Sequence, residues 1–229
     1  MHQELVQRVT KKISQLYIGV IDHIIAPPFC ASCKKFLTER MIFCLDCYDS
    51  IQPIVSVQLQ VTKLHAISVM AIADYQEPLK SLILAKAWGD IIAADQLGHL
   101  MWDMTYFKHM PCDYLVPIPL HWMRSIKRGY NQAEEIARVL AHKKNVEVAP
   151  LLARVKNTPF QSSLAFDKRL GNVKDAFVLK NIDSEKYRDK HIVLVDDLMT
   201  TGSTLASATK ILLPLKPASI TAVVACRVC

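Results

Sequence analysis

Apolar and polar positions alternate with two different periods from about residue 65 to the end of the chain. Short runs that are apolar throughout predict buried strands, and apolar residues three and four positions apart predict helices. The expected order is strand 65–75, helices 77–90 and 91–107, strand 112–120, helix 130–144, strand 191–197, helix 202–215 and strand 219–228. Fully apolar strands that alternate with helices indicate an α/β fold: a parallel sheet flanked by helices.

The periodicity is lost over residues 48–62, which contain a proline. A length of 229 residues with 51% apolar content suits one sizeable domain and a small appendage. We therefore expect an N-terminal helix and a cysteine-rich domain over residues 1–60, and the α/β domain over residues 61–229.

The apolar stretch 16–29 is the nearest approach to a membrane segment, but it is interrupted by Asp22 and His23 and is too short to span a bilayer. We expect it to form a helix that packs on the protein, with an interfacial membrane helix as the alternative. It has no small-residue cleavage site of the secretory kind, which favours a cytoplasmic protein without a membrane span.

Four of the seven cysteines form two C-x2-C pairs, Cys30 with Cys33 and Cys44 with Cys47. Each pair places two thiolates on one tight turn, and two such turns complete a tetrahedral Zn²⁺ site. A pair of disulfides is the alternative, although cytoplasmic thiols stay reduced. Four thiolates leave no open coordination position, so the predicted zinc is structural.

The stretch 192–204 runs from four apolar residues into Asp196 and Asp197, and then into a turn rich in hydroxyl groups. Ligands of parallel sheets bind beyond the carboxyl ends of strands. The residues of this turn offer hydroxyls and converging backbone N–H groups at the start of a helix, as a phosphate requires: Thr200, Thr201, Gly202, Ser203 and Thr204. The two carboxylates suit the neighbouring hydroxyls of a ribose. Helix capping alone is the alternative interpretation.

Positive charge is concentrated between residues 124 and 174, which hold eleven basic and four acidic residues, an excess equal to the net +7 of the whole chain. Such a segment favours a polyanionic partner, with binding that weakens as salt rises. The cations Arg124, Lys127 and Arg128 suit a diphosphate or DNA phosphates, and Trp122 and Tyr130 beside them suit stacking on DNA bases. The alternative is that Trp122 packs on the core while the cations are solvated.

The stretch 192–204 resembles the phosphoribosyl pyrophosphate signature of type I phosphoribosyltransferases. Together with the cysteine pairs, the chain resembles the ComF/GntX family, whose members join a small zinc ribbon to a phosphoribosyltransferase-like domain. Further matching stretches are 74–90, 116–137 and the spacing of Arg154, Thr158 and Gln161. The resemblance implies that 192–204 binds the ribose phosphate, and that Arg154 and Lys156 belong to a lid over the diphosphate; a plain connecting loop is the alternative there.

Three functions follow as hypotheses. The resemblance implies a protein that handles single-stranded DNA in natural transformation, with other DNA-uptake proteins as partners. The second is an active phosphoribosyltransferase that uses phosphoribosyl pyrophosphate with Mg²⁺. The third is an interaction module that binds a nucleotide only as a regulatory ligand.

Overall fold

The computed structural model describes residues 29–39, 41–87, 91–120, 130–155 and 176–228. Contacts divide the chain into two units, Met1–Ser50 and Ile51–Cys229, which we call the cysteine unit and the sheet unit. Each is described by itself. The limits 1–60 and 61–229 stay a prediction.

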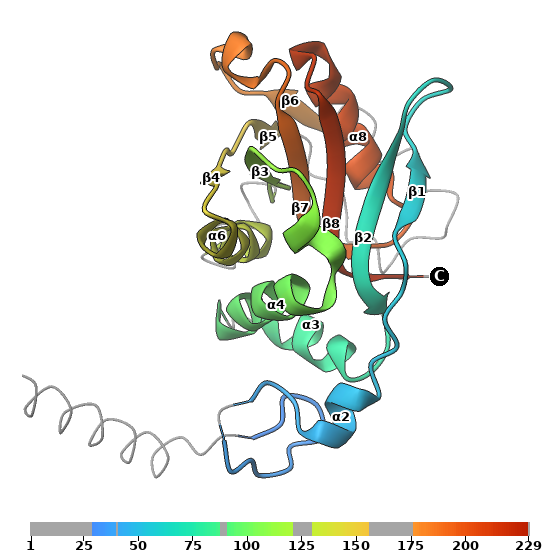
Figure 1. The fold of residues 1–229 in the computed structure, drawn as a ribbon, viewed down its shortest axis with the longest axis vertical. Coiled ribbons are helices and arrows are strands. Elements are labelled where there is room, and N and C mark those ends of the chain that lie inside the picture. The colour runs from blue at the N-terminus through green and yellow to red at the C-terminus, as the bar shows by residue number, and fades with distance from the viewer. Residues whose placement is uncertain (1–28, 40, 88–90, 121–129, 156–175, 229) are drawn as a thin grey trace, which may run out of the picture. The chain divides into compact units, whose positions relative to one another are not determined.

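The sheet unit alternates strands and helices (Figure 1). Its described strands are β1 (Val57–Gln60), β2 (Ala66–Asp74), β3 (Tyr114–Pro117), β4 (Glu147–Val148), β5 (Leu152–Arg154), β6 (Phe177–Leu179), β7 (His191–Met199) and β8 (Ser219–Arg227). Its described helices are α3 (Leu79–Ala87), α4 (Ile91–Met104), α6 (Gln132–Lys144) and α8 (Ser203–Leu212), with the 3-10 helices η1 (Tyr106–His109), η3 (Ser184–Tyr187) and η4 (Leu213–Leu215). None of the described helices is long and apolar enough to cross a membrane.

The central sheet has the strand order β1-β2-β8-β7-β3-β4 within the described residues. Within this sheet the neighbours from β2 to β4 pair in parallel, and β1 pairs antiparallel with β2. Strands β5 and β6 form a separate antiparallel pair. The predicted α/β class with a mostly parallel sheet is therefore confirmed. Because the parallel strands share one direction, they end at one edge of the sheet, the carboxyl edge, and begin at the opposite one, the amino edge.

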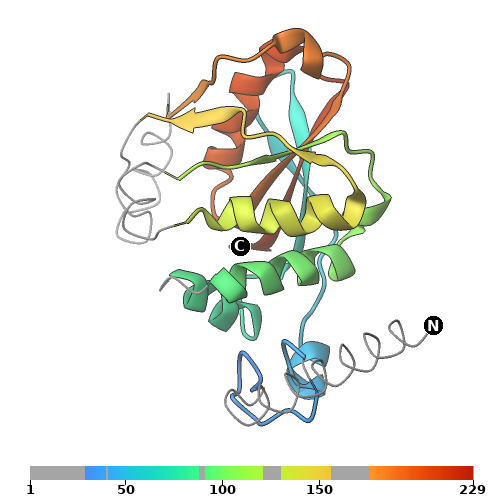
Figure 2. The ribbon, with the colours of Figure 1, turned by 90° about the vertical axis from the view of Figure 1, so that its left-hand side faces the viewer.

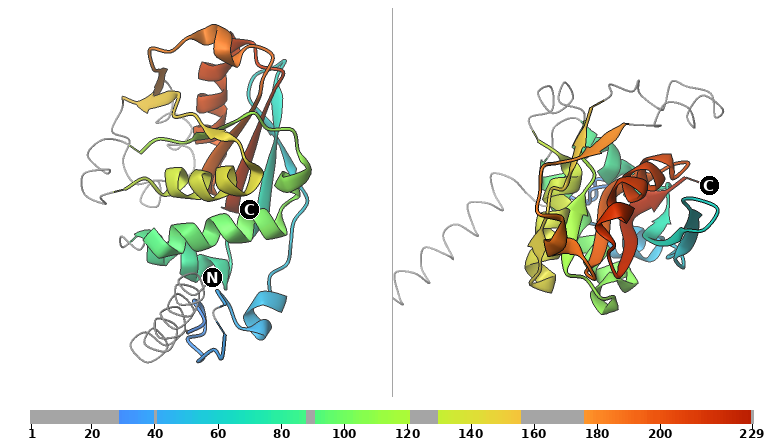
Figure 3. Two further views of the ribbon diagram at one scale, coloured as in Figure 1. Left: turned by 60° about the vertical axis from the view of Figure 1, so that its left-hand side comes forward. Right: turned by 90° about the horizontal axis from the view of Figure 1, so that it is seen from above.

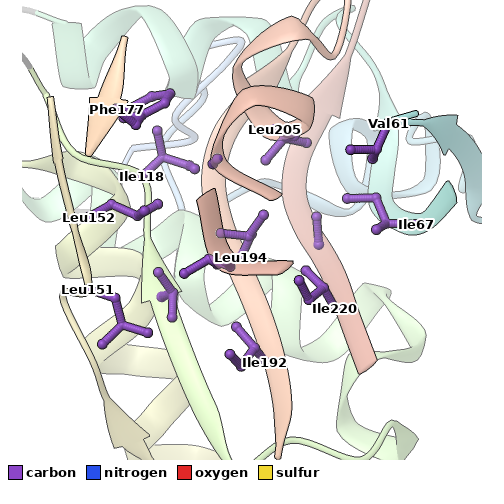
Figure 4. Packing of buried hydrophobic residues seen from close by; sticks show 14 of the residues in the cluster. Val61, Ile67, Ile118, Leu151, Leu152, Phe177, Ile192, Leu194, Leu205 and Ile220 are labelled. Carbon is purple, nitrogen blue, oxygen red and sulfur yellow. The ribbon is translucent and has the colours of Figure 1, made fainter. Parts of the chain in front are cut away.

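Helices cover both faces of the sheet (Figures 2 and 3). Helices α4 and α6 lie side by side and contact β2, β3, β7 and β8. On the other face α8 packs over a cluster of buried side chains shown in Figure 4, where Leu205 of α8 lies near Leu194 of β7. Alternate residues of β7 supply this cluster, since side chains of a strand point to opposite faces.

Helix α6 begins and ends at residues suited to those positions. The Asn131 side chain accepts a hydrogen bond from the Ala133 backbone N–H at 3.2 Å, and its amide donates to the Ile118 carbonyl at 3.1 Å. The second bond ties the start of α6 to the segment that follows β3. The helix ends at Asn145, whose φ of 58° is in the left-handed region that asparagine tolerates.

The structure differs from the sequence-based expectation in several details, for example at the end of the expected helix 91–107, where α4 stops at Met104 and η1 follows. Two further differences lie at the carboxyl edge of the sheet and at its β1 edge. Strand β7 continues past the two aspartates to Met199, because β8 is long enough to pair with it: Leu198 lies opposite Cys226, and Met199 opposite Arg227. Within the stretch 48–62, where periodicity is lost, the structure has the short edge strand β1.

Candidate functional site

The turn of residues 200–204, which we call the 200–204 turn, leads from the carboxyl edge into α8. Gly202 occupies the N-cap position with φ 72° and ψ 0°, a left-handed conformation that costs glycine nothing and other residues about 1–2 kcal/mol. The Gly202 carbonyl accepts the first helical bond, from Ala206 N–H at 2.9 Å. Because the backbone reverses sharply at Gly202, the end of β7 and the start of α8 lie next to each other.

Backbone N–H groups of this turn and of the first turn of α8 lack acceptors among the described residues. Those of Gly202, Thr204 and Leu205 donate to none of them, and no side chain caps the helix. The Ser203 N–H makes only a long contact, 3.4 Å, with Thr201 Oγ1. Unpaired donors at a helix N-terminus, where the dipole is positive, form a site for an anion.

The hydroxyl groups of the turn are half-buried and ordered by one another. The Thr201 hydroxyl donates to Ser203 Oγ at 2.9 Å. Because each hydroxyl can rotate to donate or accept, the pair can turn toward a ligand without moving the backbone.

Asp196 and Asp197 are half-buried in the part of β7 nearest the turn, and Asp196 lies opposite Val224 of β8. The Asp197 backbone N–H donates to Asp196 Oδ1 at 2.9 Å, which restrains the Asp196 carboxylate. Consecutive residues of a strand point to opposite faces. The two carboxylates are therefore expected to differ in what they reach.

Leu59 of β1 packs directly against the 200–204 turn. A Cβ atom built on Gly202 would lie 2.5 Å from Leu59 Cδ1. This close approach is a second reason for glycine at position 202, because a larger side chain would collide with Leu59; the first reason is the backbone angle. Sequence reasoning missed Leu59, although the alternation of apolar and polar residues in Val57–Gln60 was a weak signal for a strand.

An ion pair joins the ends of two neighbouring strands at the same edge. Arg227 Nε donates to Asp74 Oδ1 at 2.7 Å, and both side chains are about one-quarter exposed. The Tyr75 backbone N–H donates to the Arg227 carbonyl at 2.7 Å. Burial, and then the charges of Cys226 and Glu77, raise the pKa of the Tyr75 hydroxyl, so it stays protonated as a hydrogen-bond donor.

Several residues expected to bind phosphate or bases lie outside the described residues: Trp122, Arg124, Lys127, Arg128 and Lys156. Tyr130 is half-buried just before α6. Arg154 lies at the end of β5, with its guanidinium carbon 5.6 Å from the centre of the Phe177 ring. The structure therefore brings together the aspartates and the turn, whereas the predicted diphosphate and stacking residues stay predictions.

The cysteine unit brings its four cysteines into one cluster. Cys30 and Cys33 lie on a turn closed by the Lys34 N–H, which donates to the Cys30 carbonyl at 3.1 Å. Cys44 and Cys47 lie at the start of the short helix α2 (Leu45–Asp49). The four Sγ atoms all lie within 4.8 Å of one another, close enough to bind one metal ion.

The protonation of these thiols is unequal. Burial opposes ionisation of Cys30, but the backbone N–H groups of Cys44, Cys33 and Ser32 outweigh it and lower the pKa of Cys30 to about 6. Burial, followed by the three neighbouring thiols, raises the pKa of Cys47 to about 12. A cation bound among the four thiols would favour the deprotonated form of each, because metal ligation favours the thiolate.

Comparison with known proteins identifies the family to which this chain belongs. A family model of the phosphoribosyl transferase domain matches residues 112–228, which is half of the chain. The chain belongs to the phosphoribosyl transferase domain family. The matched part of this domain contains β3, α6, β7, the 200–204 turn, α8 and β8.

Individual proteins with similar sequences match a larger part of the chain than the family model does. Competence protein F of Haemophilus influenzae is 32% identical over 152 residues, covering 63% of this chain and 66% of the relative. DNA utilization protein YhgH of Salmonella typhi is 30% identical over 166 residues, covering 69% and 71% respectively. YhgH of Escherichia coli K12 is 29% identical over 167 residues.

The chain spans about two thirds of the length of competence protein F. These relatives and the cysteine cluster confirm the resemblance to the ComF/GntX family.

Proposed function

We propose that this chain handles single-stranded DNA in natural transformation and does so on a scaffold that binds phosphoribosyl pyrophosphate. The observation that carries the proposal is its similarity, over 63% and 69% of the chain, to proteins named for competence and for DNA utilization. A net charge of +7 supports a polyanionic partner. We further propose that it acts in the cytoplasm with other DNA-uptake proteins.

The 200–204 turn is the proposed seat of the ribose 5-phosphate. Support comes from the N–H groups of Gly202, Thr204 and Leu205, which have no acceptor among the described residues, and from the adjacent hydroxyls. A phosphate offers acceptors to all of these donors and complements the helix dipole. Asp196 and Asp197, which lie on opposite sides of β7, are proposed to accept hydrogen bonds from different hydroxyls of the ribose.

The proposed ion of the cysteine unit is Zn²⁺. Four thiolates within 4.8 Å of one another match the ligand type and number of structural zinc sites, whose Zn–S distances are about 2.3 Å. With no other ligand type in the cluster, a Mg²⁺ ion, which prefers oxygen, does not fit there. The zinc is proposed to stabilise the fold of this unit and to take no part in chemistry.

A transferase reaction is the second candidate function. The aspartate pair lies next to the 200–204 turn, so the ribose and the 5-phosphate of one phosphoribosyl group could bind there together. In this reaction the bond between ribose C1 and the diphosphate oxygen breaks, and an acceptor forms a bond to C1. Asp196 and Asp197 would orient the sugar. Mg²⁺ would neutralise the departing diphosphate when bound. A regulatory nucleotide site is the third possibility, in which binding occurs without turnover.

Fluorescence anisotropy with labelled single-stranded and duplex oligonucleotides tests the DNA proposal, with and without phosphoribosyl pyrophosphate. We expect tighter binding of the single strand and a steep loss of affinity with salt. Equal, weak binding of both DNA forms at low salt would contradict the proposal.

An assay of diphosphate release, with Asp196→Asn/Asp197→Asn as the matched background, separates the two remaining candidates. Release above this background with any base or amine supports the transferase. A rise in melting temperature with phosphoribosyl pyrophosphate but no release supports the regulatory site.

A further inference from the structure

The amino edge of the sheet unit carries an exposed aromatic pair on η1. Tyr106 is 66% exposed, and its ring centre lies 5.0 Å from that of His109, with 37° between the planes. Residues three apart in a 3-10 helix share one side, which explains the pairing. The pair leaves ring surface open to solvent at a position far along the sheet from the 200–204 turn, since η1 precedes the start of β3.

The backbone of η1 is held rigidly beneath these rings. Phe107 is fully buried, and its N–H donates to Thr105 Oγ1 at 3.3 Å. The Thr105 hydroxyl in turn donates to the Met101 carbonyl at 2.6 Å. Because Phe107 is fixed on one side of η1, Tyr106 is directed outward on the other, as a preorganised stacking platform requires.

Lysines on η1 and in the last turn of α6 lie near the aromatic rings of α4 and η1. Lys143 Nζ lies 5.9 Å from the centre of the half-buried Trp102 ring. Lys108 is exposed on η1 beside Tyr106, and neither lysine pairs with an acid among the described residues. Lys144 has a different part: its Nζ donates to the Lys108 carbonyl at 3.0 Å and joins the end of α6 to η1.

Several of the nearby acidic groups have ion-pair or hydrogen-bond partners within the protein. Arg138 binds Glu134 at 2.8 Å and also binds Glu135. Asp113 Oδ2 accepts a hydrogen bond from the His191 backbone N–H at 2.7 Å. Asp103 is exposed next to Trp102, and Asp95 lines the adjoining groove with His99 3.7 Å away, so these two carboxylates oppose an anionic ligand.

Space for an extended ligand adjoins these groups. A groove of about 490 Å³ runs between α4 and α6 and reaches His142 and Lys143 at one end. Figure 2 shows the two helices side by side, with η1 leading from α4 to β3. An extended strand that stacks on Tyr106 would therefore have a path past Lys143 into the groove.

We propose that these six residues, which we call the amino-edge patch, bind single-stranded DNA: Trp102, Tyr106, Lys108, His109, His142 and Lys143. Bases stack on the open ring of Tyr106 while Lys108 and Lys143 contact phosphates. A single strand fits better than a duplex, because only unpaired bases expose their faces for stacking. This inference rests on the proposed function and adds a DNA contact at the edge opposite the ribose phosphate site to the one predicted at Trp122 and Tyr130.

Anisotropy titration of the full chain with labelled oligothymidylate tests the patch. Lys108→Glu/Lys143→Glu is compared with Lys63→Glu/Lys210→Glu, which changes two exposed lysines elsewhere and alters net charge equally. We expect the patch variant to lose at least about ten-fold in affinity and to flatten the salt slope by about 1.4, from two phosphate contacts. The control variant is expected to stay within about two-fold of the unmodified protein, as distant charges are screened.

Tyr106→Ala should weaken binding between about five-fold and a hundred-fold, and Tyr106→Phe should restore it, since stacking needs only the ring. If the unmodified protein binds but both charge variants weaken it equally, or Tyr106→Ala has no effect, the location is wrong while DNA binding stands. If the unmodified protein binds no single strand at low salt, the proposed function fails and this inference fails with it.

Discussion

The two edges of the sheet present different kinds of surface. At the carboxyl edge, one continuous stretch supplies half-buried hydroxyls and backbone N–H groups around Gly202. At the amino edge, aromatic rings and lysines come from α4, η1 and α6, which are separate in the sequence. The first suits one compact anion held by backbone, and the second suits an extended polyanion with stacking bases. We therefore expect that substitutions at one edge weaken the binding of its ligand and leave the binding at the other edge unchanged.

Removal of the proposed zinc ion has the largest expected effect and is expected to leave both edges in place. Structural zinc in small domains supplies apparent binding free energies of about 10–16 kcal/mol, so chelation should unfold the cysteine unit. Near-ultraviolet spectra and zinc release would report this, with one ion per chain. Phosphoribosyl pyrophosphate and DNA affinities of the chelated protein should be unchanged.

Cys112→Ser is the matched control, because burial raises the pKa of the Cys112 thiol to about 12 and this residue lies outside the cluster. It should retain the ion. Loss of binding at either edge after chelation would mean that the edges depend on the cysteine unit.

Gly98→Ala should damage the amino edge alone. A Cβ atom at Gly98 would lie 2.8 Å from Val139 Cβ, so α4 and α6 must separate. We expect a loss of about 1–3 kcal/mol in the free energy of unfolding by urea, together with weaker DNA binding. Gly98→Ala/Val139→Gly, which moves the small residue to the other helix, should recover part of both. Weakened phosphoribosyl pyrophosphate binding would contradict the independence of the edges.

Gly202→Ala should damage the carboxyl edge alone. The left-handed φ costs about 1–2 kcal/mol for alanine, and the new methyl group also meets Leu59. In a Leu59→Ala background the steric part of the cost should disappear and the backbone part should remain, a coupling that a double-mutant cycle measures. Additive effects of the two changes would show that the Leu59 contact is unimportant.

The smallest effect is expected for Lys144→Met. Loss of its hydrogen bonds to the carbonyls of η1 should lower the free energy of unfolding by about 0.5–1 kcal/mol, since the site is partly exposed. DNA affinity should fall slightly as Tyr106 loses its fixed position. Lys190→Met, at another exposed lysine of the same edge, should change neither quantity.

The sequence predicted the structure well wherever the pattern that determines it is formed by residues close together in the chain. Helix α6 was predictable because its apolar residues recur at helical spacing. The 200–204 turn was predictable because its hydroxyls and Gly202 closely follow an apolar strand and two aspartates. The cysteine cluster followed from spacing alone. In each case a few neighbouring residues determine the local structure.

What sequence reasoning could not supply depends on contacts between distant segments. Strand β7 extends to Met199 only because β8 offers partners. Leu59 meets Gly202 through the pairing of β1 with β2, and four residues are too few to predict that strand. Trp102 and Lys143 meet only because α4 packs on α6.

Calorimetric titration of phosphoribosyl pyrophosphate into the full chain tests the central claim, that the 200–204 turn and its aspartates hold a phosphoribosyl group. We predict saturable binding with one site per chain. Asp196→Asn/Asp197→Asn should weaken it by at least about ten-fold, because charged hydrogen bonds contribute about 1.5–3 kcal/mol each. Absence of binding heat across temperatures, or equal affinity in this double variant, would contradict the claim.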